Sequence, residues 1–87
     1  MLIGKVAGSL WATRKNDKLS GLKFLLVELE QKNDAQTIVA ADKTGAGFGD
    51  LVLVSTGSSA RVALGDLEIP IDAAIVGIID SVERYQK

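Results

Sequence analysis

Three glycines at alternate positions are the residues whose spacing most invites a chemical interpretation. Gly45, Gly47 and Gly49 lie directly before the apolar run Leu51–Val54, and closely spaced glycines are typical of loops that cradle phosphate groups. The dinucleotide-binding fingerprint needs a glycine three residues after the second one, where this chain has Asp50. It also needs a helix next, whereas the run that follows is short, β-branched and bounded by Ser-Thr-Gly. This pattern predicts a buried strand rather than a phosphate site.

The side chains most used for proton transfer are missing. The chain has no histidine and no cysteine, which removes the commonest general base, the commonest metal ligand, disulfides and thiolate sites. Ser58 and Ser59 therefore have no base to activate them, and we predict that one of them caps a short helix over 60–64, which ends at Gly65. Four aspartates at predicted strand ends match no known metal loop, so turn and cap roles are predicted. These are Asp42, Asp50, Asp72 and Asp80. We expect no catalytic residues, no cofactor and no metal.

The composition predicts one small domain with more apolar surface than it can bury. The 87 residues are 47% hydrophobic but only 5% aromatic, with a net charge of −1. A domain of this size buries only about 60% of its extended surface, so a partner chain would cover the surplus. A complete but unusually aliphatic core is the alternative. The N-terminus does not resemble a signal peptide, and no run is long enough to span a membrane.

Alternating apolar residues predict five strands and one short helix. The strand over 23–30 is largely apolar on both faces, so we expect one face to line a barrel interior and the other to meet a neighbouring chain. This order predicts an all-β fold with one short helix, a five-stranded OB-like β-barrel with up-and-down or Greek-key connections. An open two-layer β structure is the alternative. The predicted strands cover 1–12, 23–30, 37–42, 51–55 and 73–82, with loops at 13–21 and 66–70 and a turn at 31–36.

Blocks along nearly the whole chain resemble the EutN/CcmL family, the vertex proteins of bacterial microcompartment shells. The blocks are 4–8, 11–15, 21–27, 40–42, 45–53, 57–61, 70–74 and 76–80, in family order. The resemblance implies a single vertex domain over 1–87 and a homopentamer at the corners of a carboxysome- or metabolosome-like shell. It also implies facet hexamers as partners at the rim, a place in the bacterial cytoplasm, and no enzyme activity, nucleic acid or membrane partner.

The resemblance directs attention to two short segments as subunit-interface or ring-axis candidates. Phe48 is flanked by glycines, so it must enter the core or meet a partner, and we expect a partner. The glycines around it either pack on an adjacent subunit or form a tight connection within the chain. Arg61 either stays solvated or pairs across an interface with a carboxylate such as Asp50, Asp72 or Asp80. The candidates are Gly45, Ala46, Gly47, Phe48, Gly49, Asp50, Ser58, Ser59 and Arg61.

A binding module is the alternative function. OB folds grip single-stranded nucleic acid with a basic groove and stacking aromatics, and Arg14, Lys15 and Lys18 follow Trp11 closely. An OB-like domain that binds an oligonucleotide or a small anion would use such a cluster. The negative net charge and scattered aromatics disfavour it, and a small enzyme subunit is disfavoured further by the missing His and Cys.

Overall fold

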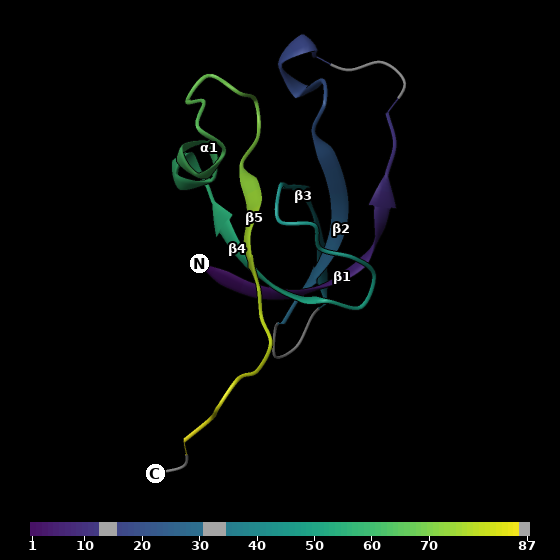
Figure 1. Cartoon of the computed structure of the whole chain (residues 1–87), viewed down its shortest axis with the longest axis vertical. Coiled ribbons are helices and arrows are strands. Elements are labelled where there is room, and N and C mark those ends of the chain that lie inside the picture. Colours follow the sequence, from purple (N-terminus) through teal and green to yellow (C-terminus); the bar gives the residue numbers. More distant parts are fainter. Residues whose placement is uncertain (13–15, 31–34, 86–87) are drawn as a thin grey trace.

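The strands close into a barrel that carries a short helix at one end. The computed structural model describes residues 1–12, 16–30 and 35–85, and within them it contains five strands and one α-helix (Figure 1). A single 3-10 turn, Asp17–Leu19, interrupts the connection between the first two strands. The elements are β1 Leu2–Leu10, β2 Lys23–Leu29, β3 Gln36–Asp42, β4 Leu51–Thr56, α1 Ser58–Leu64 and β5 Ala73–Ile78. Residues 31–34 of the predicted turn over 31–36 and residues 13–15 of the predicted loop over 13–21 lie outside the described residues, while Gln36, predicted in the turn, begins β3.

The strand order around the barrel is β1-β2-β3-β5-β4, and β1 pairs with β4 to close it. This closure confirms the predicted OB-like barrel and shows that an open two-layer structure is wrong. The up-and-down connection is also wrong, because β3 neighbours β5 rather than β4. The two run parallel and pair at only two positions, Ala41↔Ala74 and Asp42↔Ile75, whereas the other neighbours are antiparallel.

A bulge in β1 changes which side chains face the interior. The register with β2 shifts between Val6 and Gly8, and such a shift moves the following side chains to the opposite face. Val6 is buried, but Leu10 pairs with the outward-facing Phe24 and is exposed. Simple alternation along the predicted strand over 1–12 places Leu10 on the same face as Val6. This expectation is wrong, because a strict period of two cannot anticipate the bulge.

The barrel interior is filled by small aliphatic side chains, as the composition predicts. Alternate residues of β2 point inward, in agreement with the predicted face of this strand. The buried cluster consists of Val6, Leu25, Val27, Leu29, Ala40, Ala46, Val52, Val54, Ala73 and Ile75. In the described part of the chain, no helix is long and apolar enough to cross a membrane.

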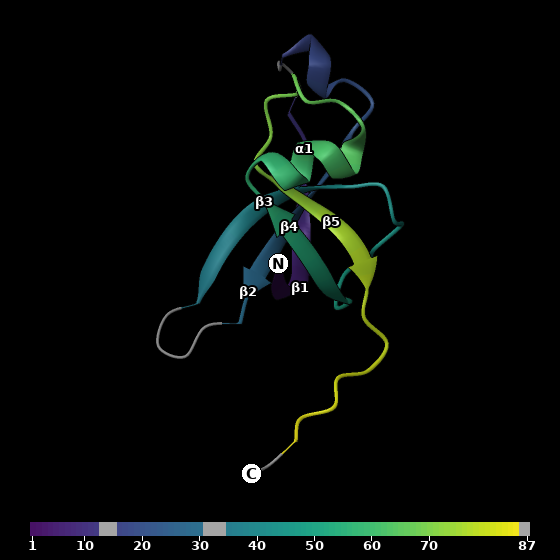
Figure 2. The ribbon, with the colours of Figure 1, turned by 90° about the vertical axis from the view of Figure 1, so that its left-hand side faces the viewer.

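Three predicted elements need corrected boundaries. β1 covers Leu2–Leu10 rather than 1–12. β5 ends at Ile78 rather than at position 82, because the Ile79 amide makes the last bond to its partner strand, at Leu51 O (2.8 Å). Beyond it, the segment 80–85 leaves the barrel (Figures 1 and 2). The helix begins at Ser58, and Gly57 is its N-cap without any side-chain cap bond, so capping by Ser58 or Ser59 is wrong. The predicted stop at Gly65 is confirmed by its left-handed conformation (φ 79°).

Candidate functional site: a rigid loop that presents Phe48

The segment 43–50, called the glycine loop here, is held at its start by the buried carboxylate of Asp42. This side chain lies at the end of β3 and is 0% exposed. It accepts hydrogen bonds from the amides of Thr44 (2.8 Å) and Ala46 (2.9 Å), and from the Thr44 hydroxyl. A carboxylate that accepts several local donors fixes the backbone around it. The first half of the glycine loop is therefore ordered by one side chain.

Lys23 and Ala46 fasten the same half of the loop to the barrel. The Lys23 ammonium donates to Ala46 O (2.8 Å) and lies 3.9 Å from Asp42 Oδ2. Ala46 itself is fully buried and belongs to the same core cluster as Val6 and Leu25. Because the Ala46 methyl belongs to the core, the glycine loop cannot move away from the barrel without opening a cavity.

The second half of the loop is held by Asp50 and by β1. The Asp50 carboxylate accepts from the Gly47 amide (2.8 Å), and the Asp50 amide donates to Gly47 O (3.0 Å). Gly49 N donates to Val6 O and Val6 N donates to Asp50 O, both at 2.9 Å, which extends the pairing of β1 into the loop. Gly49 has a φ of 85°, a conformation that side chains rarely adopt. The turn is therefore built to hold one shape.

Phe48 is presented to solvent at the tip of this turn. Its residue surface is 84% exposed, although the residues on either side are fastened by the bonds described above. When a partner covers an exposed benzyl group, the free energy of the system falls. Because the loop is already rigid, it loses little conformational entropy on binding. Burial of Phe48 in the core of its own chain, one of the two expectations, is therefore wrong, and contact with a partner stays a prediction.

The second candidate segment lies on α1. Ser59 donates its hydroxyl to Thr56 O (2.6 Å) and shares a hydrogen bond with Ser55 Oγ (2.7 Å), while Ser58 is exposed. Arg61 is half-buried, and its Nη1 donates to Ile71 O (3.0 Å). Arg61 therefore braces the segment that leads into β5, a role that the sequence prediction of an ion pair missed.

The structure groups the candidates into two sets rather than one. Figures 1 and 2 place α1 at one end of the barrel, over β4 and β5, and the glycine loop along its side. The glycine loop and α1 meet where Lys43 Nζ donates to Leu64 O at the C-terminal end of the helix (3.4 Å). Ser58 and Ser59 lie at the opposite end of α1. The candidate residues either lie on the surface or form hydrogen bonds that support the backbone. Neither set contains a nucleophile paired with a base.

Sequence reasoning missed Lys23 as a support of the loop. An aspartate followed two residues later by Thr44 is an available signal, because Asx turns use this spacing. No local sequence pattern predicts that Lys23 supports the loop. Its position depends on the pairing of β2 with β3, which brings Lys23 opposite Asp42.

The comparisons with known proteins agree with this geometry. The family model described as "Ethanolamine utilisation protein EutN/carboxysome" matches residues 1–80. The chain belongs to the EutN/CcmL family. It is 50% identical over 86 residues to the bacterial microcompartment shell vertex protein GrpN of Rhodospirillum rubrum, covering 95% of this chain and 97% of that protein. It is 48% identical to the carboxysome shell vertex protein CcmL of a Nostoc species, covering 94% of this chain and 85% of CcmL.

Solved structures of the EutN/CcmL family show the same fold. The pentameric GrpN structure aligns with a TM-score of 0.87 at 45% identity, covering 98% of this chain and 100% of that one. CcmL of Gloeobacter violaceus aligns with a TM-score of 0.88 at 41% identity, covering 97% of this chain and 90% of that one. These relatives are structural shell proteins, so this member of the family is a structural protein and not an enzyme.

Proposed function

We propose that this chain, over residues 1–87, is one vertex domain that assembles into homopentamers at the corners of a microcompartment shell in the bacterial cytoplasm. The observation that carries the proposal is the match to a pentameric shell protein over 98% of the chain. Hexagonal tiles cover a plane, and pentagonal tiles are required where the plane closes into a polyhedron. The protein would therefore act by forming a five-sided piece that closes the corner of the shell.

The glycine loop supplies one half of the contact between subunits. A closed ring uses a heterologous interface, in which two unlike faces of each protomer meet. Phe48 is the strongest candidate for its centre, because large aromatic side chains that become fully covered dominate interface energies. The rest of the loop, from Gly45 to Asp50, holds this side chain in place. Ser58, Ser59 and Arg61 form the second set, for which an interface or ring-axis position is proposed.

The outer rim of the ring meets the facet hexamers of the shell. This partner is proposed from the tiling argument and from the vertex role of the relatives. The binding-module alternative is weaker, because Lys18 of the basic cluster is already paired with Glu68 (3.5 Å) and Asp66 (4.0 Å). Arg14 and Lys15 lie outside the described residues.

Native mass spectrometry tests the proposal, together with Phe48→Ala. The unmodified protein should give particles of five 9.2 kDa chains at low and high salt. Phe48→Ala should shift these particles towards single chains, because hot-spot truncation costs about 2 kcal/mol or more per interface. The circular dichroism of the variant should stay unchanged, since Phe48 is 84% exposed in the single chain.

Two results would contradict the proposal. Single chains at every concentration, or a monomer that binds oligonucleotides tightly, would favour the OB-like binding module. Intact rings in Phe48→Ala would remove Phe48 from the interface while leaving the pentamer itself in place.

A further inference from the structure

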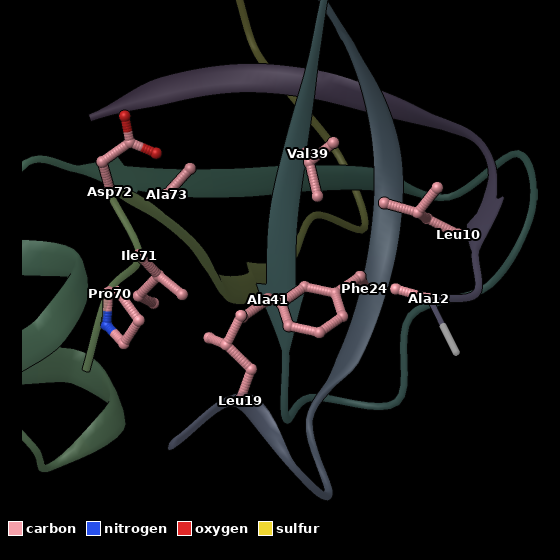
Figure 3. Close-up of a pocket in the computed structure, with 10 residues that line it drawn as sticks. All are labelled: Leu10, Ala12, Leu19, Phe24, Val39, Ala41, Pro70, Ile71, Asp72 and Ala73. Atoms are coloured by element: carbon pink, nitrogen blue, oxygen red, sulfur yellow. The ribbon is translucent and has the colours of Figure 1, made fainter. Parts of the chain in front are cut away.

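An apolar groove lies on the outside of the barrel, over β2 and β3. Figure 3 shows Phe24, Val39 and Ala41 from these strands facing Ile71 of the segment before β5, with Leu10 and Leu19 at the edges. The groove encloses about 260 Å³. Asp72 is the one ionisable residue among the described residues that line it. It is therefore a hollow suited to an apolar side chain.

The groove is exposed although its residues are of core type. Leu10 and Val39 are each 43% exposed, while the opposite side of β2 carries Leu25 and Val27, which are buried in the barrel. A strand that is apolar on both faces normally has cover on both. Among the described residues of β2, the inner face is buried and the outer face is partly exposed, so a second molecule could complete the cover of the outer face.

Side-chain bonds hold the segments that form the walls of the groove. Arg61 Nη1 donates to Ile71 O (3.0 Å) and holds that wall towards α1. Lys18, next to Leu19, pairs with Glu68 (3.5 Å) and Asp66 (4.0 Å), and so joins the segment that carries Leu19 to the one that leads to Ile71. The hollow is therefore preformed, which lowers the cost of filling it.

The groove and the glycine loop lie on different sides of the molecule. In Figure 2, β3 follows the left edge of the barrel and the loop that leads from it to β4 runs along the right edge. A protomer in a ring needs two unlike, complementary faces directed at its two neighbours. One edge carries an exposed aromatic side chain on a rigid loop, and the other carries a preformed apolar hollow.

We propose that the groove over β2 and β3 receives the Phe48 side chain of the neighbouring copy of this chain. The inference rests on the proposed function, which supplies the ring, and adds the pairing of the two faces. It assigns Val39 and Phe24 to the receiving face, and it makes Arg61 a positioning residue that shapes this face through Ile71. The occupant is a second copy because the relatives with this fold include a pentamer that the chain covers entirely.

Paired cysteines test which residues meet. The natural chain has no cysteine, so the double variant Gly47→Cys with Val39→Cys carries one thiol on each proposed face and keeps the Phe48 side chain. An added Cβ at Gly47 would meet only Asp50 Oδ2, at 3.9 Å. A short bis-maleimide should link the intact rings into a ladder of up to five chains on a denaturing gel. The matched control is Gly47→Cys with Val62→Cys, because Val62 is the same residue type on α1 and is more accessible (63% exposed) than Val39. The control should give no ladder.

The outcomes separate the two proposals. Rings by native mass spectrometry without a ladder, or an equal ladder from the Val62 control, would overturn the pairing and leave the pentamer standing. Single chains from the unmodified protein would overturn the proposed function itself. Val39→Asp supplies a second measurement: folded single chains by circular dichroism support the receiving face, and intact rings contradict it. A groove that instead binds added peptide in intact rings would also contradict it.

Discussion

At the scale of single residues, Gly4 is the position with the least room. It lies on β1 opposite β2, and an added Cβ would stand inside the van der Waals distance of Val27 Cγ1 and 3.0 Å from Glu28 O. Val27 is fully buried and Glu28 O is backbone, so neither can yield easily. Gly4→Ala should therefore lower the free energy of unfolding by about 1–3 kcal/mol, as overpacking of a core does. Urea denaturation measures this change.

Gly8→Ala is the matched control for Gly4→Ala. Gly8 lies on the same strand after the bulge, and its added Cβ would meet only Leu26 Cδ1, at an ordinary 3.5 Å. The unfolding free energy of this variant should stay within about 0.5 kcal/mol of the original. Equal losses at both positions would show that backbone freedom, rather than the contact with Val27, explains the glycine at position 4.

At the scale of elements, the glycine loop depends on Asp42. Asp42→Ala leaves the amides of Thr44 and Ala46 without their acceptor, and an unsatisfied buried donor costs about 1–3 kcal/mol. Hydrogen exchange at these two amides should therefore quicken, while exchange at Val27 in the core of β2 should not. Amide exchange followed by NMR measures both.

Asp50→Ala provides the comparison for Asp42→Ala. Asp50 accepts one bond, from the Gly47 amide, at a more exposed position, so the effect on exchange should be smaller and confined to the turn. Unchanged exchange at Ala46 in Asp42→Ala would mean that burial of the Ala46 methyl, and not the carboxylate, orders the loop.

The elements also show what a linear pattern can and cannot predict. Alternation placed β2, β3 and β4 to within a residue or so, because hydrophobic period reports which face is buried. It failed at Leu10, where a bulge reverses the faces, and after Ile78, where the apolar pattern continues but the partner strand is missing. The groove over β2 and β3 was visible only as a second apolar face on 23–30. Its wall at Ile71 comes from a distant segment, which no local pattern can reveal.

At the scale of the whole molecule, stability should depend on protein concentration. Subunits that associate only when folded stabilise one another by mass action. A tenfold increase in concentration should add about 1 kcal/mol per protomer and raise Tm by roughly 4–8 °C for a chain of this size. Differential scanning calorimetry over a dilution series measures the shift. A Tm that is the same at every concentration would indicate that the fold stands alone, against the homopentamer proposed above.

The parallel contact between β3 and β5 has a mechanical consequence. It joins the barrel at two paired positions, whereas β2 and β3 pair at seven. When a load bends the wall of the barrel, the deformation concentrates along the line with the fewest bonds. In the corner role proposed above, this seam would be the line along which each subunit bends most readily. Its stiffness, and not the packing of the interior, would set how much curvature one subunit tolerates.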